Sequence, residues 1–305
     1  MVQRLRALLA LVMRCRAFFV LACTAMVLVR VLPRHTHEVK VSVPVPTLGK
    51  ATRPMLRPRV RPAPQVAADQ GAGSHTDTVF LCNCVQDWLQ EQCNDYRGMH
   101  VPRPQTWGDV QQHVDRLASS GAFGREGSVG EKVQVAQAGG SEQRLAAELS
   151  LKARLLVGKG LSSGLPQSLG RQIQLDVEEV GLVLAKLLPA TQEIEVKLEL
   201  LGENCCRRWH QDHNTGRAIV TYNCCGTEYV EHDSVNFYEL GHGRDNDHIV
   251  RDSSQVFSAS PADVLFMKGK LFPGDVNGLV HKSPERRYHA NGTIMNRLCL
   301  KLDVC

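Results

Sequence analysis

The spacing of the apolar side chains changes near residue 193, and this change constrains the fold more than any other feature of the chain. Before it, apolar residues recur at helical intervals, most clearly over residues 177–188, and that segment stops at Pro189. After it, residues 193–200 alternate charged and apolar side chains, which is typical of a half-buried strand. The sequence therefore predicts helices first and a β unit second.

Shorter segments extend this pattern on both sides of the change. Helices are also expected over residues 107–117 and 141–156, with loops in the Gly-rich stretches 121–140 and 158–170. Further strands are expected over residues 217–222, 227–230, 235–240, 264–267, 278–280 and 295–304. Many short strands at this spacing favour a jelly roll. We therefore expect an α+β fold, with a helical N-terminal half packed on a C-terminal jelly-roll sheet.

The first 75 residues differ from the rest of the chain. Residues 1–31 place arginines around two apolar runs, which predicts a signal peptide, a signal anchor or a transit segment. Residues 32–75 are rich in Pro and Arg and are expected to form a disordered linker. We expect the secretory pathway or a single-pass membrane location, with residues 7–30 available as the anchor; a mitochondrion or plastid is the alternative.

Residues 76–305 are expected to form a single domain, with a mainly helical part over 76–192 and the jelly-roll part over 193–305. Its charge differs from that of the leader. Residues 1–67 hold twelve basic residues against one acid, whereas the remainder holds 24 basic and 30 acidic residues. Because residues 68–305 carry a slight excess of acidic residues, the sequence has no net positive charge there that would indicate nucleic-acid binding.

Nine of the eleven cysteines lie beyond the leader. Their spacing matches no paired CxxC zinc pattern, and adjacent cysteines such as Cys205 and Cys206 rarely bridge each other. For most of them the sequence favours buried thiols with a few bridges.

The pattern that points to chemistry is His210-Gln-Asp212, followed at a distance by His281. In an extended segment, positions i and i+2 project to the same side, so His210 and Asp212 can bind one ion together. Two histidines and one carboxylate on a single face bind Fe(II) and leave coordination positions open. The sequence therefore predicts a metal site at His210, Asp212 and His281, with no catalytic residue assigned beyond these ligands.

The surrounding residues resemble prolyl-hydroxylase-like Fe(II)/2-oxoglutarate oxygenases. After HxD come Arg217, a strand ending in Tyr222 and a Gly-Thr turn, and later His281 and Arg297. The resemblance implies a double-stranded β-helix, cupin-like sheet that holds Fe(II) and 2-oxoglutarate. It also implies that Arg297 pairs with the far carboxylate of 2-oxoglutarate, with Tyr222 and Thr227 as further cofactor-binding residues.

A closer resemblance is to a family of unknown activity, domain of unknown function 1826. It rests on five motifs in order: residues 206–212, 217–229 with Gly226-Thr-Glu-Tyr, 263–269, 279–284 and 297–303. This resemblance implies a domain boundary and a site but no substrate, either small molecule or protein. The chain departs from the family pattern by extra residues around 238–251 and 288–293.

Alternatives to these assignments remain open at this point. Arg217, Arg286 and Arg287 compete with Arg297 for the carboxylate, and the stretch from His232 to His248 is a solvated loop or a second metal binder. The main rival function is a non-enzymatic, cupin-like module that binds zinc or another divalent ion, because the same three ligands suit several first-row metals.

Overall fold

The computed structural model describes residues 78–135, 141–274 and 277–305. These residues belong to one compact unit, residues 68–305. The predicted leader (1–31) and linker (32–75) lie outside the described residues, so their boundaries stay predictions. No helix in the described ranges is long and apolar enough to cross a membrane.

A seven-stranded sheet forms the centre of the domain. Its order is β1-β2-β8-β5-β10-β4-β3, and all neighbours are antiparallel except the parallel pair β1 and β2. Its strands are β1 (Val79–Leu81), β2 (Gly98–Val101), β3 (Ser128–Gln134), β4 (Glu193–Leu201), β5 (Gly216–Thr221), β8 (Val264–Lys268) and β10 (Arg297–Val304).

The two faces of this sheet differ because side chains alternate along each strand. On β10, Leu298, Leu300 and Leu302 are fully buried on one face. Arg297 and Lys301 point to the other face, where they line a cavity. The apolar face forms the main core, and the polar face is free to build a site.

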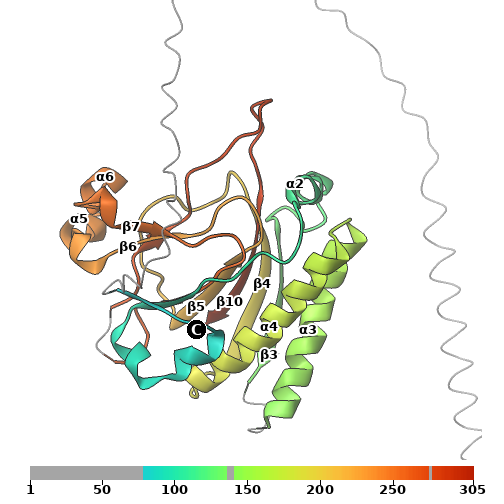
Figure 1. Cartoon of the computed structure of the whole chain (residues 1–305), viewed down its shortest axis with the longest axis horizontal. Coiled ribbons are helices and arrows are strands. Elements are labelled where there is room, and N and C mark those ends of the chain that lie inside the picture. The colour runs from blue at the N-terminus through green and yellow to red at the C-terminus, as the bar shows by residue number, and fades with distance from the viewer. Residues whose placement is uncertain (1–77, 136–140, 275–276) are drawn as a thin grey trace, which may run out of the picture. The chain divides into compact units, whose positions relative to one another are not determined.

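Three helices belong to the apolar side: α2 (Gln111–Ser120), α3 (Glu142–Ser162) and α4 (Gln167–Leu187). Figure 1 shows α3 and α4 side by side across the sheet. Ser141 caps α3 by accepting a hydrogen bond from the Arg144 amide. The two helices approach closely at Gly181, where an added Cβ would lie 2.5 Å from Leu149.

A small sheet of order β7-β6-β9 packs on the polar side of the large one. Tyr229 of this sheet packs with Ile219, Leu265 and Met267 of the large sheet. The small sheet comprises β6 (Glu228–Val230), β7 (Val256–Ser258) and β9 (His281–Lys282), and α5 (Phe237–Gly241) and α6 (Asn246–Ile249) lie between β6 and β7 in the chain. Short 3-10 turns complete the fold: η1 (Val85–Leu89), η2 (Glu91–Asp95), η4 (His232–Ser234) and η5 (Ser253–Gln255).

The mixed α+β class with a large sheet is confirmed, but residues 76–192 are not simply helical. They contribute β1, β2 and β3 to the large sheet, and β3 lies inside the predicted loop 121–140. β3 is an edge strand with only Val133 buried, so its sequence carries no clear alternation. The predicted strand over 235–240 is largely α5, because the Asn236 side chain caps a helical turn by accepting a hydrogen bond from the Glu239 amide.

Candidate metal centre

His210, Asp212 and His281 converge, although the third lies 69 positions beyond the second in the chain. The segment carrying His210 pairs with β9 in an antiparallel bridge. The His210 amide donates to the His281 carbonyl (3.0 Å), and the His281 amide donates to the His210 carbonyl (2.9 Å). Residues paired in this way project their side chains in the same direction, and the two ring centroids lie 4.4 Å apart.

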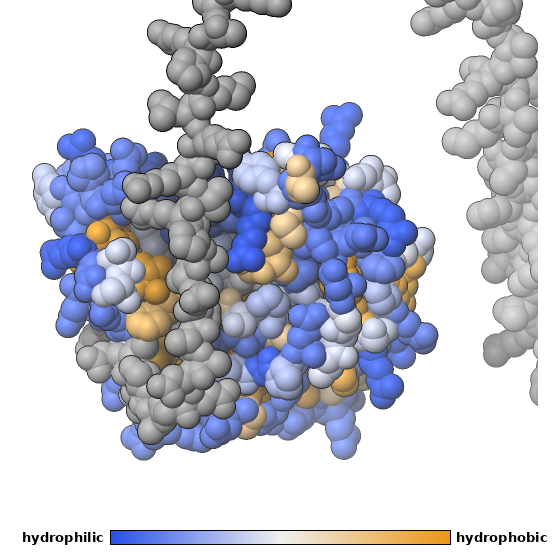
Figure 2. Space-filling view, turned by 45° about the horizontal axis from the view of Figure 1, so that its top comes forward, coloured by the Kyte–Doolittle hydropathy of each residue, from blue (hydrophilic) through white to orange (hydrophobic). Residues whose placement is uncertain are grey.

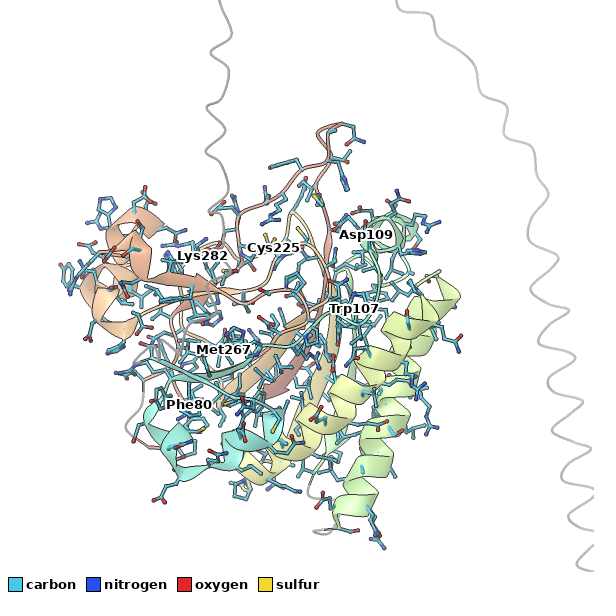
Figure 3. The ribbon with its side chains drawn as sticks, in the orientation of Figure 1. Phe80, Trp107, Asp109, Cys225, Met267 and Lys282 are labelled. Carbon is cyan, nitrogen blue, oxygen red and sulfur yellow. The ribbon has the colours of Figure 1, made fainter. Side chains whose placement is uncertain are left out.

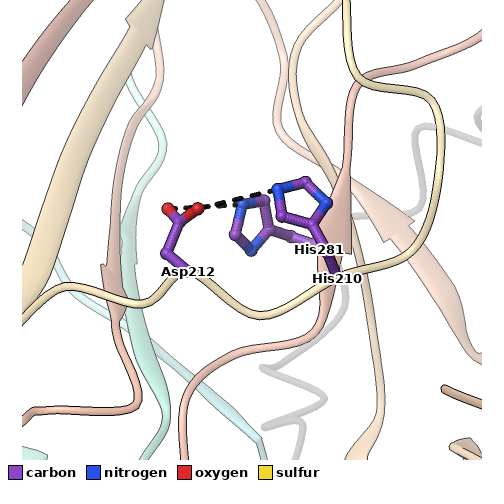
Figure 4. Close-up of side chains that lie close together, drawn as sticks. All are labelled: His210, Asp212 and His281. Atoms are coloured by element: carbon purple, nitrogen blue, oxygen red, sulfur yellow. Dashed lines mark ion pairs between the residues drawn. The ribbon is translucent and has the colours of Figure 1, made fainter. Parts of the chain in front are cut away.

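The ligand atoms of the three residues all lie within 4.8 Å of one another. Nε2 of His210 and Nε2 of His281 each lie 3.6 Å from an oxygen of Asp212 (Figure 4). These separations suit atoms that would each bind one ion at about 2.0–2.2 Å from different directions. In the part of the chain that the structure describes, this is the only group of three or more such ligands.

Backbone carbonyls fix the proton on each imidazole. Nδ1 of His210 lies 2.8 Å from the Arg208 carbonyl, and Nδ1 of His281 lies 3.0 Å from the Leu279 carbonyl. Because a carbonyl only accepts, Nδ1 carries the hydrogen in both rings and Nε2 keeps its lone pair. Both Nε2 atoms are therefore set to bind a metal.

Burial and charge keep His281 and Asp212 in their metal-binding protonation states. Burial is the main reason that the pKa of His281 falls to about 4, so this ring is neutral at pH 7. Burial alone would raise the pKa of Asp212, but His210, His281 and Arg217 outweigh it and hold that pKa well below its ordinary value. The site thus presents a neutral His281 imidazole and an ionised Asp212 carboxylate.

Arg217 orients the carboxylate of Asp212. Its Nη1 donates to Oδ2 of Asp212 (2.7 Å), and its Nε donates to Asp303, its cross-strand partner on β10. Both contacts occupy the guanidinium, so Arg217 is a support for the site and not a free carboxylate binder.

Asn246 is a supporting residue that sequence reasoning did not identify. Its side-chain oxygen accepts a hydrogen bond from the Trp209 amide (3.0 Å), and its Nδ2 donates to the Arg207 carbonyl (2.7 Å). The stretch expected to be a loop or a second metal binder therefore holds the His210 segment in place. The sequence shows only a polar residue in a segment of extra residues, and this does not indicate which residues it will hydrogen-bond.

A cavity of about 320 Å³ opens beside the two histidines. Its lining includes Thr227, Ile219 and Met267 together with His210, His281 and four cations, Arg217, Lys282, Arg297 and Lys301. Figure 3 shows Met267 and Lys282, which line it from the large and the small sheet respectively. The cavity therefore lies between the two sheets, on the polar face.

Arg297 differs from the other cations of the cavity. Lys282 pairs with Glu228 (2.6 Å), Lys301 pairs with Glu199 (2.5 Å), and Arg217 is held as described. Arg297 is only 5 % exposed, and its Nη1 donates to the Cys225 carbonyl (3.2 Å) while its Nη2 is buried without a partner. Among the described residues lining the cavity, it is the only cation without an acidic partner.

Thr227 and Tyr222 occupy different sides of the large sheet. Thr227 lines the cavity, so its cofactor-binding role stays a prediction. Tyr222 is buried in the main core, where its hydroxyl donates to Oδ2 of Asp176 (2.7 Å) and its ring packs on Trp107. The cofactor-binding role expected for Tyr222 is therefore corrected, because its side chain points to the helical face.

Arg286 and Arg287, the other arginine candidates, lie at a separate cavity, and Cys206 lies beside the His210 ring. Arg286 donates to the Glu203 carbonyl, and Arg286 and Arg287 line a separate, smaller cavity. Cys206 lies 3.8 Å from Nδ1 of His210, on the side of the ring opposite the metal-facing nitrogen. None of these three residues joins the group of candidate ligands.

Comparison with known proteins gives a family and a set of distant structural likenesses. The family model described as "Protein of unknown function (DUF1826)" matches residues 128–303. Comparison with curated proteins finds no match.

Several solved structures are similar at low identity. One is dioxygenase for auxin oxidation 1 from Arabidopsis thaliana in a binary complex with 2-oxoglutarate; it is 9 % identical with a TM-score of 0.40 over 74 % of this chain and 91 % of that one. Another is a full-length protein from Neurospora crassa in complex with alpha-KG, 8 % identical with a TM-score of 0.32 over 68 % and 73 %. A bsmA homolog from Methylobium petroleophilum is 15 % identical with a TM-score of 0.24 over 46 % and 51 %.

Proposed function

The chain belongs to the DUF1826 family, and we propose that it is a metal-dependent oxygenase of the Fe(II)/2-oxoglutarate type. The observation that carries the proposal is the buried guanidinium of Arg297, which has no acidic partner and one nitrogen without a hydrogen bond, in the lining of the same cavity as the two histidines. A buried cation without a counter-ion is costly, so this position favours an anionic ligand.

The donor set fits Fe(II). Two imidazole nitrogens and one carboxylate oxygen are the ligands of the open non-haem iron site. A closed structural zinc site normally takes four protein ligands, and the described residues supply three within reach. The three ligands therefore favour a site that keeps positions for small molecules.

The co-substrate fits the remaining features. 2-Oxoglutarate carries a keto-acid end, which suits a metal, and a second carboxylate, which suits a guanidinium. Arg297 is the residue that would hold this second carboxylate, and Thr227 lies in the same cavity. When bound, iron and 2-oxoglutarate would supply the oxidising power for inserting an oxygen atom from O₂ into a small-molecule or protein substrate.

The protein's own contribution is positioning. The Arg208 and Leu279 carbonyls keep the two Nε2 atoms unprotonated, and Arg217 holds the carboxylate of Asp212 toward them. Ile219 and Met267 give the cavity an apolar floor, which excludes water from one side of the site. For the fold, we propose a double-stranded β-helix; the support is the site's position between a large, mainly antiparallel sheet and a small antiparallel one.

Succinate formation and metal content test the proposal. Purified protein is expected to bind iron and to convert 2-oxoglutarate to succinate with iron and ascorbate, while His210→Ala abolishes both. His213→Ala is the matched control, because His213 is exposed and is not among the candidate ligands. Bound zinc without succinate would replace the proposal by the non-enzymatic module, and absence of any bound metal would refute both.

For the leader, the proposal is entry into the secretory pathway or membrane anchoring through residues 7–30. Asn291 begins a glycosylation sequon and is exposed in the folded domain, so it reports on that route. In cells, a gel shift that glycosidase treatment and Asn291→Gln both remove would support the proposal. An unglycosylated chain that co-fractionates with mitochondria or plastids would overturn it.

A further inference from the structure

Two adjacent cysteines, Cys224 and Cys225, bring their sulfur atoms into contact in the loop after β5. The two Sγ atoms lie 3.3 Å apart, at hydrogen-bond distance for sulfur. Cys224 also has φ +67°, a left-handed backbone conformation that residues other than glycine rarely adopt. Such a conformation in a non-glycine residue is a reason to look for function.

The pair lies beside a small cavity with a positive lining. This cavity of about 10 Å³ is lined by Cys224, Cys225 and three arginines, Arg286, Arg287 and Arg297. Among these arginines, which line the cavity, Nε of Arg286 and Nη2 of Arg297 are buried without a hydrogen-bond partner; Arg297 also lines the larger cavity beside the histidines. The space holds about one water molecule, so it admits only a very small reagent.

This environment makes the two thiols unlike each other. The hydrogen bond from Cys225, followed by the charges of Arg287 and Arg297, outweighs burial and lowers the pKa of Cys224 to about 7. The same hydrogen bond, together with burial, raises the pKa of Cys225. At neutral pH one sulfur is partly thiolate, which is the nucleophilic form, and its neighbour is a thiol.

We propose that Cys224 and Cys225 form a modification site that small hydroperoxides oxidise reversibly to a vicinal disulfide. The Cys224 thiolate attacks hydrogen peroxide: an S–O bond forms, the O–O bond breaks, and the hydroxide that leaves takes a proton from the solvent. The Cys225 sulfur then attacks the Cys224 sulfur: an S–S bond forms, the S–O bond breaks, and the departing hydroxide takes the Cys225 proton. Two thiols lose two electrons, and one peroxide becomes two waters.

The disulfide is expected to be labile. Consecutive Cα atoms are about 3.8 Å apart, whereas ordinary disulfides join Cα atoms about 4.4–6.8 Å apart. Strained disulfides have more oxidising potentials and are easily reduced, which suits a reversible site.

Oxidation of this pair would also change the position of a hydrogen-bond partner of Arg297. The Cys225 carbonyl accepts the hydrogen bond from Nη1 of Arg297, and closing the disulfide ring moves the Cys225 backbone. This second step rests on the proposed function: if Arg297 holds 2-oxoglutarate, oxidation weakens co-substrate binding. The first step, disulfide formation, does not depend on it.

Peptide mapping tests the first step, with an internal control in the same chain. The protein is treated with hydrogen peroxide, alkylated and digested, with and without later dithiothreitol. The 224–225 peptide is expected to lose two hydrogens and escape alkylation, and dithiothreitol is expected to restore both thiols. Cys205 and Cys206 are the adjacent control pair, because the hydrogen bonds of Cys206 Sγ are to His210 and the Arg208 carbonyl; this pair should be alkylated twice.

Serine variants separate this mechanism from general oxidation. Cys225→Ser is expected to leave a sulfenic acid at Cys224 that dimedone labels, and Cys224→Ser should leave Cys225 unreactive. Full alkylation of both cysteines after peroxide, or a bridge from Cys224 to Cys205 in the same cavity, would overturn the proposal.

Binding of 2-oxoglutarate to the Mn(II)-loaded protein tests the second step. Peroxide is expected to weaken this binding by about tenfold in the natural chain and not in a Cys224→Ser/Cys225→Ser double variant. An equal loss of 2-oxoglutarate affinity in both proteins would show that oxidation of the cysteine pair does not act through Arg297. If the reduced protein binds no 2-oxoglutarate at all, the proposed function fails, whereas the peptide map still decides the fate of the cysteine pair.

Discussion

His210 and His281 donate their backbone amides to each other's carbonyls, and this reciprocal pairing places their imidazoles 4.4 Å apart. One histidine lies in the segment after β4 and the other on β9 of the small sheet, so the pairing joins two distant parts of the chain. The metal-facing geometry is thus a consequence of backbone register. The residue types at positions 210 and 281 decide only which metal-binding atoms lie there.

Arg217→Gln is expected to weaken metal binding. Arg217 holds the carboxylate of Asp212 and also pairs with Asp303, so its loss leaves Asp212 free to turn away. Residues that orient a ligand typically contribute about 10–100-fold to metal affinity. Competition titration with a fluorescent chelator measures the change. Arg207→Gln, an exposed arginine paired with Glu285, is the control and should leave affinity unaltered.

Arg297→Met is expected to weaken 2-oxoglutarate binding without reducing the stability of the protein. Because one amino group of this buried arginine has no partner, the ligand-free variant should be as stable as the natural chain or more stable. Binding of 2-oxoglutarate should fall by about 100-fold, while metal affinity stays the same. Calorimetry and chemical denaturation give both values. A large loss of stability would instead identify Arg297 as a structural residue.

The metal-free protein is expected to lose stability as pH falls from about 6.5 to about 4. The folded chain holds the pKa of His281 at about 4, against 6.5 for the free side chain, so between these values only the unfolded chain binds this proton. The free energy of unfolding therefore rises with pH over this window, by about 3 kcal/mol in total. The pKa of Asp212 is lowered instead, so its contribution disappears only below its ordinary value of 3.8. Urea unfolding at several pH values with a chelator present measures the slope, and His281→Gln should flatten it.

Tyr222→Phe is expected to reduce stability without affecting the site. The variant removes the hydrogen bond to the fully buried Asp176, which keeps its two contacts to Arg103 (2.6 and 2.7 Å). A loss of about 1–3 kcal/mol is expected, because a hydrogen bond to a charged group is broken. Affinity for 2-oxoglutarate should match that of the natural chain. A selective loss of that affinity would instead indicate that Tyr222 takes part in binding the co-substrate.

Much of the candidate site follows from local sequence pattern. The i, i+2 spacing of His210 and Asp212 places both ligands on one side, and the alternation along β10 separates Arg297 from its neighbouring leucines. The same alternation also shows why Tyr222 fails. Arg217 and Tyr222 are five positions apart, so in one extended strand they point to opposite faces.

Other features depend on tertiary structure that no local pattern encodes. Asn246, the first residue of α6, supports the His210 segment although it lies 37 positions along the chain from Trp209. β3 is a strand because β4 offers it an edge, since its own residues SVGEKVQ bury one valine. The fold class was predictable from the periodicity of apolar residues. The edge strand β3 and the support that Asn246 gives to the His210 segment were not.

His281 lies on β9 of the small sheet, and Asp212 lies between β4 and β5 of the large sheet, where its carbonyl accepts a hydrogen bond from the Lys270 amide just beyond β8. An ion bound by all three ligands would therefore act as a cross-link between the two sheets. Its binding energy would add to the free energy of unfolding by mass action, so the melting temperature would report occupancy directly. The surface visible in Figure 2 is mainly hydrophilic with scattered apolar side chains. Inside the domain, the small sheet packs on the large one through the cluster around Tyr229. Chelation should accordingly accelerate amide exchange in β6 and β9 before it affects β10.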